Sequence, residues 1–213
     1  MSSKNPTFAS SFEGLEQMIK HLNGPNGCPW DKEQTSISLI PMFIEECYEL
    51  VDAIKSNNIE NIIEEIGDVI FHIGFQIQIA NSLDLFDSNL IFHNVIKKYI
   101  HRHPHVFQNK EFKDMPELKK TWEAIKKVEK GKERDSILDG VPKSLPALAY
   151  SKAIQKKASN IGFDWETLPE IDEKMIEEIN EFKNAESDQE REEEFGDLIF
   201  TLVNIGRHQG IDA

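Results

Sequence analysis

The sequence predicts an all-α protein, built as a bundle of helical hairpins. Apolar residues recur every three or four positions through most of the chain, and no segment keeps the alternation of period two that marks a strand. Short clusters of glycine, proline, asparagine and serine separate the periodic segments and predict turns between helices. The chain has 213 residues, 39% of them hydrophobic and 29% charged, so one or two domains with a buried core are expected.

Caps and turn residues bound the predicted helices of the first half. Ser10 and Glu13 form a candidate capping box at the start of the first helix, and Pro41 is tolerated in the first turn of the second. Serine and asparagine at residues 56–58 predict a tight turn. The fourth helix should end before Pro104, because the residue before a proline disfavours helical geometry. Helices are therefore expected at about residues 12–22, 41–55, 59–77 and 90–100.

A change of composition separates two halves of the chain. Residues 108–145 are rich in lysine, glutamate, glycine and proline, and they predict a charged connector with one short helix around Trp122. The predicted organisation is a first domain at 1–107, this connector, and a second domain at 146–213 that is incomplete at its C-terminal end.

The second half repeats an acidic pattern of the first. Glu-Glu-Cys-Tyr-Glu at residues 45–49 recurs 132 residues later as Glu-Glu-Ile-Asn-Glu at 177–181. Glu-Ile-Gly-Asp at 65–68 recurs 129 residues later as Glu-Phe-Gly-Asp at 194–197. The difference of three residues predicts a shorter loop in the second hairpin.

Four carboxylates of the first half are predicted to converge. The apolar stripe of the helix after Pro41 centres near Cys47, and the stripe of the next helix centres near Ile66. On each helix one acidic residue lies about 100° and another about 160° from that centre, in the same rotational sense. The short connection makes an antiparallel hairpin. In such a hairpin, residues that are displaced from the two stripes in the same rotational sense lie on the same side of the contact between the helices. The converging residues, the first acidic cluster, are Glu46, Glu49, Glu65 and Asp68.

Convergence of acids favours a bound divalent cation, because like charges at helical spacing repel each other. Carboxylate-only ligation selects Mg²⁺, with Mn²⁺ as the alternative. Two other interpretations stay open: the acids are solvated surface charges, or they belong to a di-iron bundle. A di-iron bundle requires Glu-x-x-His pairs, whereas Asp68 stands three residues after Glu65. The repeat predicts a second metal-ligating set, the second acidic cluster, formed by Glu178, Glu181, Glu194 and Asp197.

The charge balance narrows the class of partner. With 24 basic and 38 acidic residues the formal net charge is −14, which argues against polymeric nucleic acid and anionic membranes as partners. Cys28 and Cys47 predict free thiols in a reducing compartment. The N-terminus lacks the layout of a signal peptide, and polar residues interrupt the longest apolar stretch, at 69–80. A cytoplasmic protein is therefore expected.

Several motifs together resemble one known family. They are the acidic hairpin pattern and the strings Gly-Cys-Pro-Trp-Asp at 27–31, Arg-His-Pro-His-Val-Phe at 102–107 and Asn-Ile-Gly-Phe-Asp-Trp at 160–165. With them the chain resembles the MazG family of nucleoside triphosphate pyrophosphohydrolases over nearly its whole length, in a two-copy arrangement. The resemblance implies an α-helical homodimer that uses Mg²⁺ to hydrolyse a (d)NTP to the monophosphate and pyrophosphate.

The resemblance also implies residue roles. The first acidic cluster supplies the metal ligands, and Lys98 and Arg102 match the family's basic pair that contacts phosphate. The alternative is that Lys98 and Arg102 are ordinary basic residues at a helix C-terminus, where positive charge interacts favourably with the helix macrodipole. Trp30 either stacks on a base or pins its turn to the core. The general base stays open between Glu45 and an outer ligand of the cluster.

The second copy departs from the family pattern. Positions 129 residues after Lys98 and Arg102 fall near 227 and 231, beyond Ala213. We therefore predict that the first acidic cluster is the working site, and that the second holds a cation but binds triphosphate poorly, because phosphate charge is left uncompensated. The alternative function is a non-catalytic helical module that retains the scaffold and binds a partner protein or a nucleotide.

Overall fold

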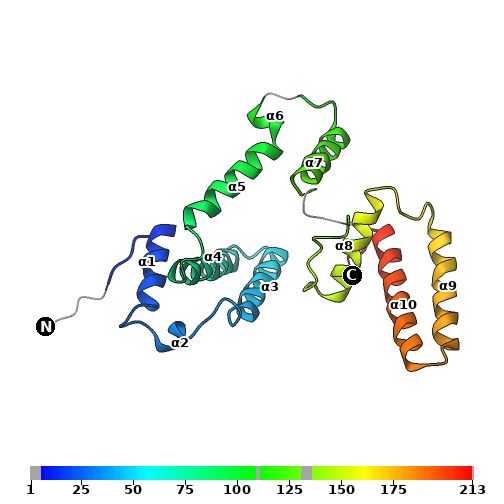
Figure 1. The fold of residues 1–213 in the computed structure, drawn as a ribbon, viewed down its shortest axis with the longest axis horizontal. Helices are drawn as coiled ribbons and strands as arrows, with labels where there is room; N and C mark the ends of the chain where they lie inside the picture. The colour runs from blue at the N-terminus through cyan, green and yellow to red at the C-terminus, as the bar shows by residue number, and fades with distance from the viewer. Residues whose placement is uncertain (1–5, 109–110, 131–135, 213) are drawn as a thin grey trace. The chain divides into compact units, whose positions relative to one another are not determined.

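The protein is seen in a computed structural model that describes residues 6–108, 111–130 and 136–212. In these residues every regular element is a helix, which confirms the all-α prediction (Figure 1). The first part of the chain forms α1 (Phe12–Leu22), α2 (Pro29–Lys32), α3 (Ile40–Ser56), α4 (Ile59–Ser82), α5 (Ser88–Arg102) and α6 (Pro104–Phe107). The rest forms α7 (Met115–Lys130), α8 (Ala147–Ser159), α9 (Leu168–Asn184) and α10 (Asp188–His208).

The N-cap of α1 lies one residue after the predicted one, although the helix begins at Phe12 as predicted. Its N-cap is Ser11, whose hydroxyl accepts a hydrogen bond from the backbone N–H of Gly14 at 3.2 Å. The predicted capping box at Ser10 is therefore wrong. Ser11 has the extended backbone that a capping residue needs, and its hydroxyl meets the third residue of the helix.

The chain divides into two compact units, and the first covers residues 1–112. In this unit α1 and α3 both pack on α4. Its fully buried side chains are Ile19 from α1, Leu39 at the start of α3 and Phe75 from α4. Gly74 lies close to α1, since a Cβ atom there would lie 2.8 Å from the Cδ1 atom of Ile19. The α3–α4 hairpin is thereby braced from one side.

The second unit covers residues 113–213 and is built around the α9–α10 hairpin (Figure 1). α8 also packs on α10. Ile171 of α9 and Val203 of α10 are buried. The side-chain amide of Gln155 on α8 donates to the backbone carbonyl of Phe200 at 2.7 Å, which fixes α8 against α10.

The two hairpins differ mainly in how far the first helix continues past its acidic residues. Residues 57–58 connect α3 to α4, and residues 185–187 connect α9 to α10. The prediction of a shorter second loop is therefore wrong. α9 ends three residues after Glu181, whereas α3 ends seven residues after Glu49. The lost length is about one helical turn, so the acidic residues keep the same face of the hairpin.

The connector holds a longer helix than its composition suggested. α7 runs for 16 residues, because lysine, glutamate, leucine and alanine are strong helix formers and an apolar residue recurs at helical spacing. Two stretches of the predicted connector, 109–110 and 131–135, lie outside the described residues. The domain limits at 107 and 146 stay a prediction.

Candidate metal centre

Three glutamates of the first acidic cluster come together beside the α3–α4 hairpin. Glu46 and Glu49 lie one turn apart on α3, and Glu65 faces them from α4. One carboxylate oxygen of each lies within 4.8 Å of the other two. Two helices joined by a two-residue loop thus bring three acids to one place.

Asp68, the fourth member, contributes its charge to the same place. Burial is the main cause that raises the pKa of Glu46 above its ordinary value, followed by the charges of Glu49 and Asp68. Burial, then Glu49, also raises the pKa of Glu65, with Asp68 a smaller cause. The Asp68 side chain is exposed and is not among the three that lie within 4.8 Å. The ionised carboxylates therefore repel one another, and a bound divalent cation would relieve that repulsion.

The second acidic cluster has the same layout in the second unit. Glu178 and Glu181 on α9 and Glu194 on α10 each place a carboxylate oxygen within 4.8 Å of the other two. Burial, then the charges of Glu181 and Glu178, raises the pKa of Glu194, and Asp197 adds to the effect. Glu178 is buried, so this cluster is more enclosed than the first.

Sequence reasoning missed a basic residue in the second acidic cluster. The ammonium of Lys174 lies 2.8 Å from a carboxylate oxygen of Glu178 and 2.8 Å from one of Glu177. Hydrogen bonds to these two acids raise the pKa of Lys174 above its ordinary value. The spacing of four residues to Glu178 is the signal that could have found it. The equivalent residue in the first half is Met42, so the two clusters differ in charge.

A histidine in the first unit was missed as well. The Nε2 atom of His72 lies 4.0 Å from the Oε1 atom of Glu46. Burial lowers the pKa of His72, opposed by the negative charge of Asp68. Its position four residues after Asp68 on α4 was the available signal, since residues at that spacing share a helix face.

The predicted substrate-binding residues lie on other elements of the first unit. Lys98 and Arg102 stand in the last turns of α5, and the ammonium of Lys98 lies 5.3 Å from the ring centroid of Tyr99. Trp30 is in α2 and is 53% exposed. None of the three is on the hairpin that carries the acids, so their contact with substrate stays a prediction.

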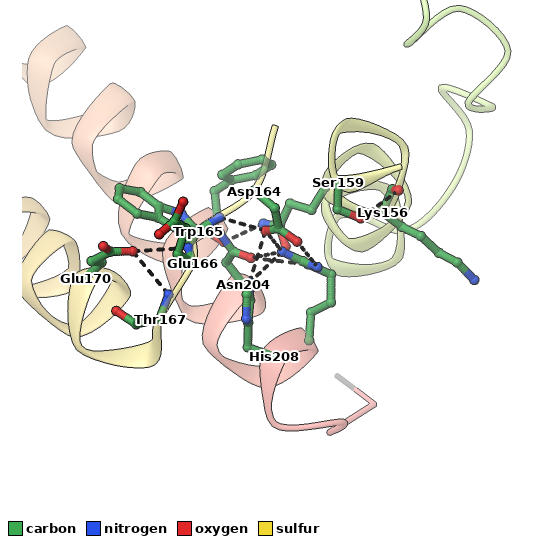
Figure 2. Close-up of polar contacts among 12 residues, drawn as sticks. Lys156, Ser159, Asp164, Trp165, Glu166, Thr167, Glu170, Asn204 and His208 are labelled. Atoms are coloured by element: carbon green, nitrogen blue, oxygen red, sulfur yellow. Dashed lines mark hydrogen bonds and ion pairs between the residues drawn. The ribbon is translucent and has the colours of Figure 1, made fainter. Parts of the chain in front are cut away.

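A polar network in the second unit ties the loop before α9 to the end of α10 (Figure 2). Both carboxylate oxygens of Asp164 accept hydrogen bonds from the guanidinium of Arg207, one of them at 3.0 Å. The Nε2 atom of His208 lies 3.0 Å from Asp164, and Asn204 also accepts from Arg207, at 2.7 Å. The hydrogen bond from Arg207 is the main cause that lowers the pKa of Asp164 to about 2. The backbone N–H of Trp165 also donates to Asp164, at 3.0 Å.

Replacing Asp164 with asparagine should weaken this end of α10 in a pH-dependent way. Because the pKa is lower in the folded protein, the interaction stabilises it above about pH 4 and is lost as the pH falls towards 2. We expect a local loss of about 1–2 kcal/mol at pH 7, which makes the amides of residues 204–211 exchange with deuterium roughly tenfold faster.

The matched control for this prediction is Asp188→Asn, since Asp188 forms an exposed pair with Arg191 at 3.2 Å on the same helix. It should leave those amides unchanged. Equal exchange of wild type and Asp164→Asn at pH 7 would contradict the prediction.

Two helical hairpins, each with an acidic cluster at its side, define an all-α protein with a repeated acidic site. The MazG nucleotide pyrophosphohydrolase domain matches residues 34–107, which include the first acidic cluster. The chain is 42% identical over 202 residues to the nucleoside triphosphate pyrophosphohydrolase/pyrophosphatase MazG of Thermotoga maritima, covering 94% of this chain and 77% of that protein. The chain belongs to the MazG family.

Two further curated proteins and one solved structure are similar to this chain. A nucleoside triphosphate pyrophosphohydrolase of Escherichia coli K12 is 41% identical over 211 residues, covering 96% of this chain and 80% of that protein. The uncharacterized protein YabN of Bacillus subtilis is 42% identical over 205 residues, covering 94% of this chain and 42% of that protein. A crystal structure of a MazG-related protein from Thermotoga maritima aligns with 54% of this chain and 98% of its own, at 29% identity and a TM-score of 0.47.

Proposed function

We propose that this chain hydrolyses nucleoside triphosphates, with ribose or deoxyribose, to the monophosphate and pyrophosphate. The observation that carries the proposal is the convergence of Glu46, Glu49 and Glu65 within 4.8 Å, inside the segment that matches the MazG domain. The names of the relatives support it, since both the Thermotoga and the Escherichia proteins are nucleoside triphosphate pyrophosphohydrolases.

The first acidic cluster would hold a divalent cation, Mg²⁺ or alternatively Mn²⁺. Its donor set consists of carboxylate oxygens, which are the ligands these ions prefer. When bound, such an ion polarises a phosphoryl oxygen and lowers the pKa of a coordinated water. The carboxylates would hold the ion, water would attack phosphorus, and the P–O bond between the monophosphate and pyrophosphate would break. Glu45, or an outer acidic residue of the cluster, accepts the proton of the attacking water.

The cationic residues of α5 would compensate the remaining phosphate charge. Lys98 and Arg102 are four residues apart, so they share a face of the helix. A triphosphate brings several negative charges to a chain of net charge −14, so basic contacts distal to the acids are required. Trp30, half exposed in α2, is available to stack on the base or to hold its turn.

The proposal is tested by incubating the full chain with a panel of NTPs and dNTPs and Mg²⁺, and by separating pyrophosphate from orthophosphate among the products. We expect pyrophosphate and the monophosphate in equal amounts. Release of orthophosphate and a diphosphate would contradict the reaction. No turnover of any nucleotide by the folded chain would favour the non-catalytic helical module instead.

We further propose that the chain acts as a homodimer. Ile59, Ile63, Ile66 and Ile73 form one stripe along α4, and they are 62%, 67%, 43% and 42% exposed. A monomer rarely leaves so continuous an apolar face in water, so a second copy is the expected partner.

Sedimentation velocity at micromolar concentration should therefore give a dimer, and Ile63→Glu should shift the protein towards the monomer by placing a charge in the stripe. The control is Ile161→Glu, since Ile161 is similarly exposed, at 62% against 67% for Ile63, but lies in the second unit outside the stripe. A compact monomer of the wild-type chain would contradict the proposal.

We propose a cytoplasmic location because both cysteines are free. Cys28 and Cys47 are both free cysteines, which suits a reducing cytoplasm. None of the described helices combines the length and the apolar content needed to cross a membrane.

A further inference from the structure

His72 is a buried polar residue whose surroundings do not explain it. Its side chain is 9% exposed, and the Nδ1 atom is buried without a hydrogen-bond partner. The rings of Phe43 and Phe71 lie beside it, with centroids 6.3 Å and 5.8 Å from the imidazole. Burying a polar ring in such surroundings costs free energy unless its polar atoms form hydrogen bonds.

The other ring nitrogen faces the first acidic cluster. His72 follows Asp68 by four residues and Glu65 by seven, so it lies on the face of α4 that carries these acids. Its Nε2 atom is 4.0 Å from the Oε1 atom of Glu46, whose side chain is 23% exposed. That distance exceeds a hydrogen bond by about 1 Å, and polar contacts at such sites commonly shorten when the ligand binds.

We propose that His72 is a positioning residue whose Nε2–H donates to Glu46 and fixes the direction of that carboxylate for the cation. The inference rests on the proposed cation site of the first acidic cluster. It requires the proton on Nε2 and leaves Nδ1 as a bare acceptor. That assignment fits the burial of Nδ1, because an unpaired acceptor is tolerated more readily than an unpaired N–H.

The second half also places a nitrogen group beside the carboxylate equivalent to Glu46. The equivalent of Glu46 in the second half is Glu178, and it too has a nitrogen partner, the ammonium of Lys174 at 2.8 Å. The equivalent of His72 is Thr201, which is buried at 7% exposure, and the equivalent of Lys174 is Met42. Each half therefore places a nitrogen group beside the equivalent carboxylate, from α4 in one and from α9 in the other.

The first measurement needs no cation. The ¹⁵N chemical shifts of His72 in the cation-free full chain should be those of the Nε2–H tautomer, whereas the Nδ1–H tautomer would overturn the inference. His72→Phe, which is compatible with the neighbouring rings, should remove the donor without loss of helicity. His72→Gln should keep a donor near the position of Nε2.

The second measurement is Mn²⁺ affinity, followed by electron paramagnetic resonance, in full chains that also carry Glu181→Gln and Glu194→Gln so that only the first acidic cluster remains. His72→Phe should weaken binding by about 10–100-fold, as loss of an outer-shell partner commonly does. His72→Gln should recover most of it, and His93→Phe, at an exposed position on α5, should change nothing.

The outcomes separate the two proposals. Wild-type Mn²⁺ affinity in His72→Phe would overturn the role of His72 and leave the cation site intact. No Mn²⁺ binding in the chain that retains His72 would contradict the cation site itself, and with it the task assigned to His72, even if the tautomer is the expected one.

Discussion

Replacing Glu49 with glutamine is expected to lower pyrophosphohydrolase turnover by about 100-fold or more. Glu49 lies within 4.8 Å of Glu46 and Glu65, and its charge helps to raise the pKa of both. Loss of a direct ligand should cost at least as much as loss of an outer-shell partner, for which 10–100-fold is common. Helicity should be kept, because the substitution removes a repulsion. Turnover at saturating Mg²⁺ and circular dichroism measure the two effects.

The matched control is Glu181→Gln, at the equivalent position of the second acidic cluster. It should leave most of the activity, because the ammonium of Lys174 already neutralises charge beside Glu178 and reduces the attraction for a cation there. Loss of activity in Glu181→Gln with retention in Glu49→Gln would show that the second acidic cluster is the working site and that the first is not.

Removal of divalent cations is the second change with a large expected effect. Dialysis against a chelator should abolish hydrolysis, and Mg²⁺ or Mn²⁺ should restore it, because a triphosphate cannot approach the ionised cluster without a counter-charge. Full activity in the presence of excess chelator would contradict the cation requirement.

The same cation should also raise thermal stability. The pKa values of Glu46, Glu65 and Glu194 are raised in the folded protein, so at neutral pH the ionised acids oppose folding and a bound cation offsets this. At a concentration 100 times the dissociation constant, one site contributes about 2.7 kcal/mol. The unfolding temperature should be higher with Mg²⁺ than without it, and Glu49→Gln should reduce the difference.

The periodic pattern was sufficient to predict the helices but not the residues at which they begin and end. Isoleucine spacing placed the start of α4 at Ile59, whereas the helix continues to Ser82, beyond the predicted end at 77. The cap moved from Ser10 to Ser11, and the missing residues of the second hairpin came from α9 instead of its loop. Helix ends depend on competing local hydrogen bonds that differ little in free energy, and a repeat offset does not say where they fall.

The sequence by itself determined the all-α fold, the repeat and the acids that line one side of each hairpin, because helical period and a short turn leave a single arrangement. The tertiary structure decided which group of a neighbouring helix faces those acids. His72 of α4 lies beside Glu46 of α3. Such contacts depend on how the side chains of neighbouring helices pack. The spacing of residues along the chain does not fix the distances between them.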